Sequence, residues 1–238
     1  MNRAVIVIAA VLVVAIGAFA VNMSSGAPAG TATAPVEFDG MDDMNTLAQV
    51  AQPAVQGNPD ARIRIIEFGD YGCPACAGFY STIKPQIELA YGDNEDVAFV
   101  YYDMPILNAH PHAFVASRAA RCAGDQGRYW EYHGALFEDQ QTWSLAASTP
   151  LGRLESYAAD IGIDEDEFSS CLRSDAHAEV VTANLELARN LGVSGTPTVM
   201  VSDGSGSAQR IGNDFGSIQQ AVGAALGQGA ESGDEGGQ

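Results

Sequence analysis

Basic residues are scarce in this sequence. Its 238 residues include 11 Lys and Arg against 30 Asp and Glu, which gives a formal net charge of −19. This shortage of cations argues against a nucleic-acid partner, because little in the chain could neutralise a phosphate backbone. The acidic residues are spread along the chain, as is typical of a solvated surface that aids solubility.

Charge is absent from residues 4–21, a run of 18 apolar residues. This run is just long enough to span a bilayer and exceeds the core of a usual signal peptide. Arg3 precedes it and acidic residues follow it, so the bulk of the chain is predicted to face outward. We therefore predict that residues 1–22 form an anchor in the inner (cytoplasmic) membrane. The alternative is a signal segment cleaved near residues 18–20, where a small-x-small pattern fits, which would give a secreted protein.

Cysteine is scarce as well, with four residues in the whole chain. Either reading of the N-terminus exports the domain to an extracytoplasmic or periplasmic space. Such a compartment is oxidising, and an even number of cysteines there predicts two disulfides.

Two of the cysteines, Cys73 and Cys76, follow the Ile-rich predicted strand at residues 62–68 and a Gly-containing loop, at the predicted start of a helix. The helix dipole and the free N–H groups stabilise a thiolate on the first cysteine. We predict a redox-active pair in which Cys73 is the nucleophile and Cys76 is the buried resolving partner. The alternatives are a structural disulfide and half of a zinc site. Zinc needs two further ligands, and only His110 and His112 are near in the sequence.

The apolar pattern divides the rest of the chain into elements. Residues 23–45, rich in Ser, Gly, Ala, Pro and Thr, are predicted to be a flexible linker, and the acidic residues 227–238 a disordered tail. Between them the sequence predicts, in order, a strand at 62–68, a helix at 74–91 kinked at Pro85, a strand at 97–102, helices at 109–123, 126–138, 151–161, 164–174 and 176–191, strands at 198–201 and 209–211, and a helix at 215–226.

This order places a βαβ half before a ββα half around one sheet, which is the thioredoxin arrangement. We predict an α/β protein with a thioredoxin-like fold over residues 46–226. Its halves lie at about residues 46–104 and 192–226. The helices at about 105–191 predict an all-helical domain inserted between the second strand and the strand that follows Pro197.

Four separated blocks of sequence carry a family likeness. They are residues 67–76, residues 104–106 with His110-Pro111 close behind, residues 126–133, and residues 192–198. With these blocks the chain resembles the DsbA family of exported thiol–disulfide oxidoreductases, particularly its membrane-anchored bacterial members, from about residue 58 to residue 226. Two departures concern the site. Pro74-Ala75 stands between the cysteines where well-studied members usually have Pro-His, and Thr196 stands where they tend to have Val, so their strongly oxidising potential is not carried over.

The resemblance implies that Thr196 and Pro197 form a loop with a cis-proline that faces the two cysteines. A cis bond fixes a tight bend, and proline has no N–H of its own. The neighbouring backbone is then free to pair with an extended substrate. The alternative is an ordinary trans proline that opens a strand.

Glu67 is an acid within an otherwise apolar predicted strand. Burial of a carboxylate is costly, so we expect a raised pKa or a compensating partner. We predict that Glu67 exchanges protons with Cys76 during disulfide cleavage. The alternative is a solvated strand end at which Glu67 faces water.

Cys122 and Cys171 lie on two predicted helices of the insertion. In an exported protein we predict a structural disulfide between them, and closing a loop of this length contributes about 4 kcal/mol in the chain-entropy model. The alternative is two free cysteines in the core. His110, His133 and His177 are expected to be packing or surface residues.

The predicted reaction is oxidation of dithiols in unfolded or newly exported proteins, with no cofactor and no metal. The reduced enzyme would need a membrane quinone-linked partner to reoxidise it. The same cysteines working in reverse would make a reductase or isomerase, which is the first alternative. A zinc-binding structural module is the remote one.

Overall fold

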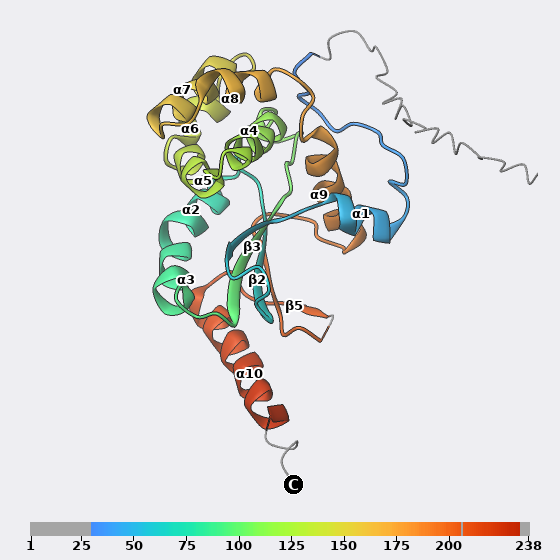
Figure 1. Cartoon of the computed structure of the whole chain (residues 1–238), viewed down its shortest axis with the longest axis vertical. Coiled ribbons are helices and arrows are strands. Elements are labelled where there is room, and N and C mark those ends of the chain that lie inside the picture. Colours follow the sequence, from blue (N-terminus) through green and yellow to red (C-terminus); the bar gives the residue numbers. More distant parts are fainter. Residues whose placement is uncertain (1–29, 206, 234–238) are drawn as a thin grey trace, which may run out of the picture.

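A five-stranded sheet forms the centre of the molecule, and the helices of residues 113–172 gather beyond one end of it (Figure 1). The structure is a computed structural model that describes residues 30–205 and 207–233. The strands at Ile63–Gly69 and Val97–Asp103 are parallel neighbours, and the other neighbouring pairs are antiparallel. The strands are β1 (Ala54–Gly57), β2 (Ile63–Gly69), β3 (Val97–Asp103), β4 (Thr198–Ser202) and β5 (Ala208–Arg210), in the spatial order β1-β3-β2-β4-β5.

Side chains of β2 alternate between two covered faces, because successive residues of a strand point to opposite sides. Ile63 and Ile65 join the main core, which includes residues of α2 (Pro74–Thr82), α3 (Lys84–Tyr91) and α10 (Phe215–Gly233). Phe68 packs on the other face, in a cluster with residues of α9 (Ala178–Asn190). Glu67 has the parity of Ile63 and Ile65, so it lies on the face that α2 covers.

The predicted helix over residues 74–91 is two helices, which meet at Ile83. Pro85 lies in the first turn of α3, where the missing N–H costs no helical hydrogen bond. The interruption therefore falls before the proline rather than at it.

Between β3 and β4 the chain is helical, which confirms the predicted thioredoxin-like fold with a helical insertion. One helix of this insertion has a different role, because α9 packs on α1 (Met44–Val50) and on β3 and so covers the sheet. The inserted helices are α4 (Ala113–Asp125), α5 (Tyr129–Glu138), α6 (Gln140–Ser144), α7 (Leu151–Asp160), α8 (Glu165–Leu172) and α9.

The N-terminal segment is docked on the insertion from residue 30 onward, which corrects the predicted flexible linker over residues 23–45 for residues 30–45; residues 23–29 lie outside the described residues. The Ala32 N–H donates to the Ser174 carbonyl at 3.3 Å, and the Val36 N–H donates to the Thr182 hydroxyl at 3.1 Å. Phe38 packs against the cluster shared by α1 and α9. Two hydrogen bonds and the apolar side chain of Phe38 therefore hold a segment whose composition alone is typical of a linker.

At the other end, α10 continues to Gly233, beyond the predicted end at residue 226, so residues 227–233 of the predicted disordered tail are helical. The rest of that tail and the predicted membrane segment at residues 1–22 lie outside the described residues. Within residues 30–205 and 207–233, no helix has the length and apolarity needed to cross a bilayer.

Candidate active site

The two cysteines lie where β2 passes into α2. Cys73 is the residue that precedes the first turn of α2, and its N–H donates to the Asp70 carbonyl at 3.0 Å. Cys73 is 9 % exposed, whereas Cys76, one turn into the helix, is fully buried. Both are free thiols. The strand end and the helix start thus present one sulfur at the surface and hold the other beneath it.

The surroundings of the two sulfurs separate their acidities. The pKa of Cys73 is lowered to about 5. The largest cause is a hydrogen bond with Cys76, and the Thr196 side chain and the N–H groups of Cys76 and Ala75 add to it. Burial acts in the opposite direction. The same bond with Cys73, then burial and the negative charge of Glu67, raise the pKa of Cys76. Cys73 is therefore a thiolate at neutral pH, and Cys76 keeps its proton.

The loop before β4 faces Cys73 and contains the cis peptide bond between Thr196 and Pro197. The Cys73 sulfur lies 3.5 Å from the Thr196 carbonyl oxygen. The Thr196 hydroxyl is buried without any hydrogen-bond partner. The Thr196 side chain is among the influences that lower the Cys73 pKa, because a hydroxyl in this position can donate to a thiolate at Cys73.

Glu67 lies beneath the cysteines and is 2 % exposed, so the alternative of a solvated strand end is wrong. Burial raises its pKa from the usual 4.5 to about 8; the charge of Lys84 opposes this rise, and that of Cys73 adds to it. One of its carboxyl oxygens has no hydrogen-bond partner. A carboxyl group with a pKa near neutrality can give up or accept a proton in the pH range in which thiols react.

The sequence did not identify Lys84, which is the cation that acts on Glu67. Lys84 is 5 % exposed, and its ammonium group donates to the side chains of Gln56 and Glu88 and lies 5.1 Å from the centre of the Trp130 ring. These contacts hold the positive charge of Lys84 where it acts on the buried Glu67. The only feature of the sequence that could have indicated this role is the position of the lysine beside a proline at the start of a helix.

Two further residues hold the loop that carries Cys73. The buried Gln140, at the start of α6, donates from its amide to the carbonyls of Tyr71 and Cys73 at 2.7 and 2.9 Å. The buried carboxylate of Asp70 accepts a hydrogen bond from the Gly72 N–H at 2.7 Å. Sequence reasoning missed both, because α6 is a single short helix without a periodic pattern and Asp70 lies in a loop.

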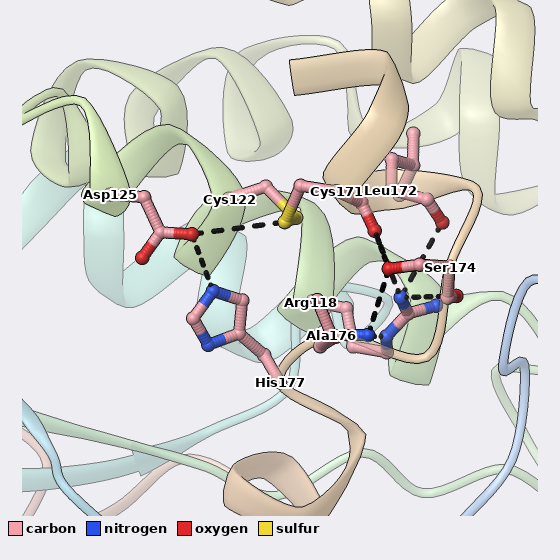
Figure 2. Close-up of polar contacts among 8 residues, drawn as sticks. All are labelled: Arg118, Cys122, Asp125, Cys171, Leu172, Ser174, Ala176 and His177. Atoms are coloured by element: carbon pink, nitrogen blue, oxygen red, sulfur yellow. Dashed lines mark hydrogen bonds and ion pairs between the residues drawn. A yellow bond between two sulfur atoms is a disulfide. The ribbon is translucent and has the colours of Figure 1, made fainter. Parts of the chain in front are cut away.

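In the insertion, Cys122 of α4 and Cys171 of α8 are joined by a disulfide with Cα atoms 5.9 Å apart (Figure 2). His177 lies beside it and pairs with Asp125 at 2.7 Å. Among the described residues, the one group of three potential metal ligands is made of these two cysteines and His177. Cys73 and Cys76 do not belong to such a group, so the geometry does not favour the zinc alternative for the CxxC pair.

His133 is a buried packing residue: its ring is 1 % exposed, and its Nδ1 lies 2.8 Å from the Tyr71 hydroxyl. His177 is partly exposed, at 23 % of its side chain. His110 is 19 % exposed and pairs with Asp70 at the edge of the cysteine site, a partner that the sequence did not indicate.

Comparison with known proteins agrees with this geometry. The sequence matches the family model described as thioredoxin over residues 49–213, which is more than half of the chain. It is 28 % identical over 159 residues to disulfide bond formation protein D of Bacillus subtilis, covering 64 % of this chain and 71 % of that protein. It is also 30 % identical over 164 residues to the Na(+)/H(+) antiporter NhaA 1 of Salinispora arenicola, covering 69 % of this chain. The chain spans about a quarter of the length of the antiporter relatives it matches.

Solved structures show the same fold. Oxidised BdbD from Bacillus subtilis superposes with a TM-score of 0.63 at 26 % identity, over 74 % of this chain and 96 % of that one. Wolbachia pipientis alpha-DsbA1 superposes with a TM-score of 0.64 at 20 % identity, over 74 % and 94 %. The chain therefore belongs to the thioredoxin family, and its helical insertion gives it the DsbA-type form of that fold.

Proposed function

We propose that this protein is an exported thiol–disulfide oxidoreductase that introduces disulfides into extracytoplasmic proteins. The observation that carries the proposal is the pKa of Cys73, which the surrounding hydrogen bonds lower to about 5. A stabilised thiolate favours the reduced form of the Cys73–Cys76 pair, so its disulfide readily accepts electrons. The names of two of its relatives, disulfide bond formation protein D and alpha-DsbA1, agree with this activity.

In the proposed reaction a substrate thiolate attacks the sulfur of Cys73 in the disulfide form, and the bond to Cys76 breaks. Cys76 leaves and takes up a proton, for which Glu67 beneath it is the proposed donor. A second substrate thiolate then attacks the substrate's own sulfur in the mixed disulfide, and Cys73 leaves as a thiolate. The substrate loses two electrons and the enzyme gains two.

Substrate binding is assigned to the loop at Thr196 and Pro197. This loop faces Cys73, and an extended polypeptide laid along it would pair with its backbone. Unfolded or newly exported proteins fit such a site, because their thiols are accessible. Reoxidation is assigned to a membrane quinone-linked partner, close to which an anchor at residues 4–21 would keep the enzyme.

The test is the redox potential of the Cys73–Cys76 pair, measured in glutathione buffers on a Cys122→Ser/Cys171→Ser background. An oxidase is expected to have a potential well above the value of about −270 mV typical of thioredoxin. A value near that of thioredoxin would argue against the oxidase and for a reductase that uses the same cysteines. Oxidation of a reduced, unfolded substrate by the disulfide form, with a Cys73→Ser variant as control, checks the direction independently.

A further inference from the structure

The side chain of Asp70 is fully buried beside the cysteine site and is held by three donors. It accepts hydrogen bonds from the Gly72 N–H at 2.7 Å, from the Ile106 N–H at 2.8 Å, and from His110 Nδ1 at 2.7 Å. A carboxylate can only accept, so His110 carries its proton on Nδ1. Asp70 therefore fixes both the loop before Cys73 and the ring of His110.

This ring lies against the residue that precedes Cys73. A Cβ atom built on Gly72 would lie 2.5 Å from the Cβ of His110, so glycine is what allows the two segments to approach so closely. The His110 side chain is 19 % exposed. An imidazole thus lies at the rim of the site, on a loop that follows β3 and is distant in sequence from the two cysteines.

The charges around His110 favour its protonated form. Its pKa is raised, first by the hydrogen bond to Asp70 and further by the negative charges of Asp70 and of Cys73, against burial, which lowers it. Within the described part of the chain these are the charged groups that act on its titration. Attraction between two charges is mutual, so a group stabilised by the Cys73 thiolate stabilises that thiolate equally.

We propose that His110, held by Asp70, is a positioning residue that places a positive charge next to the Cys73 thiolate and so makes the Cys73–Cys76 disulfide a stronger oxidant. The inference rests on the proposed function. Pro74 and Ala75, the residues between the cysteines, carry no charge that could stabilise the thiolate. The proposal assigns this stabilisation to a histidine in a loop.

The first test needs no substitution at the site. The pKa of His110 is measured by NMR in the dithiol and disulfide forms, with His177 in the same spectra as control. The Cys73 thiolate exists only in the dithiol form, so the His110 pKa is expected to be higher there by at least about half a unit, a threefold change in its acid dissociation constant. Equal values in the two forms would overturn the proposal.

The second test uses three variants: His110→Gln, His110→Lys and, as the matched control in the insertion, His177→Gln. His110→Gln is expected to lower the acid dissociation constant of Cys73, followed by thiolate absorbance, about tenfold, with up to the same change in the glutathione equilibrium. His110→Lys is expected to restore part of the effect, and His177→Gln to leave both unchanged. An unaltered Cys73 pKa in a folded His110→Gln protein would contradict the proposal.

These measurements are separate from the test of the proposed function. If the potential assigns the protein to a reductase, the coupling between His110 and Cys73 still appears in the titrations. If the coupling is absent, oxidation of substrate by the wild-type disulfide is unaffected.

Discussion

At the scale of single residues, the structure places an acid, Glu67, where water cannot reach it. The raised pKa of about 8 means that the neutral carboxyl group is the form that favours the folded state. This contribution to stability is complete below about pH 4.5 and is lost as the pH rises through about 8.

Replacing Glu67 by Gln separates charge from shape. Well above pH 8 the Glu67→Gln variant is expected to be more stable than the wild type by about 5 kcal/mol, and near pH 4 the two should be equal, because the protonated carboxyl and the amide are alike. Urea unfolding at both pH values measures this difference. Glu131→Gln, at a position 46 % exposed, is the control.

The same variant tests the proton-transfer role proposed for Glu67. The rate of substrate oxidation should fall, and its pH profile should lose the inflection near 8. An unchanged rate and profile in Glu67→Gln would leave Glu67 with no part in the reaction.

The Thr196 hydroxyl is buried without a hydrogen-bond partner, and we propose that it donates to the Cys73 thiolate. Thr196→Val keeps the shape of the side chain and removes this donor, so the pKa of Cys73 should rise from about 5 by up to about one unit. Absorbance of the thiolate during a pH titration measures the change. The control is Thr46→Val, on the remote helix α1, which should leave the Cys73 pKa unchanged (Figure 1). If Thr196→Val also left the Cys73 pKa unchanged, the hydroxyl would not reach the sulfur.

At the scale of elements, the turn between α8 and α9 is built around a buried arginine (Figure 2). Arg118 is fully buried. Its guanidinium donates to the carbonyls of Ala32, Ser174 and Ala176 at 2.6 to 2.7 Å, and lies 3.4 Å from the carbonyls of Cys171 and Leu172. One side chain thus donates hydrogen bonds to backbone carbonyls at the end of α8, in the turn that follows it and in the docked N-terminal segment.

Removing this guanidinium would leave several buried carbonyls without donors. Arg118→Ala is expected to lower the free energy of unfolding by about 3 to 5 kcal/mol. Arg118→Lys should recover only part of this loss, because an ammonium group cannot span the same set of oxygens. Chemical denaturation measures both, and equal stability of Arg118→Lys and wild type would show that charge alone matters.

The elements that the sequence predicts well are those in which a local pattern decides the structure. The apolar runs of β2 and β3 and the helices of the insertion follow such patterns, and Asp164 caps α8 by accepting from the Glu167 N–H. Strand β1 was missed, because it is a short strand whose pairing with β3 is set from outside its own sequence. The docked residues before α1 were missed for the same reason.

The site divides in the same way. Cys73, Cys76, Pro197 and Glu67 are marked by motif, order or an unexpected charge in an apolar run. Lys84, Gln140 and the pair of Asp70 and His110 act across long separations in the chain, and no local pattern identifies such partners. Their roles depend on distances that only the folded chain sets.

At the scale of the whole molecule, the bond between Cys122 and Cys171 closes a loop of 49 residues within the insertion. Loss of this cross-link is expected to cost about 4 kcal/mol in the chain-entropy model, which lowers the melting temperature by about 10 °C for a chain of this size. The measurement compares Cys122→Ser/Cys171→Ser with the parent chain, both in a Cys73→Ser/Cys76→Ser background. Equal melting temperatures would show that the bond does not stabilise the fold.

If residues 4–21 anchor the protein as proposed, the docking of the N-terminal segment would set how far the enzyme can travel from the membrane. A flexible linker over the predicted residues 23–45 could extend to about 80 Å, whereas the covalent length of the seven residues 23–29 is at most about 25 Å. Ala32 is held on the insertion by its hydrogen bonds. With the anchor proposed at residues 4–21, the insertion would therefore stay within about that distance of the bilayer. The enzyme would then be confined to a thin layer at the membrane surface. It would react with substrates as they emerge from the membrane rather than after diffusion through the compartment.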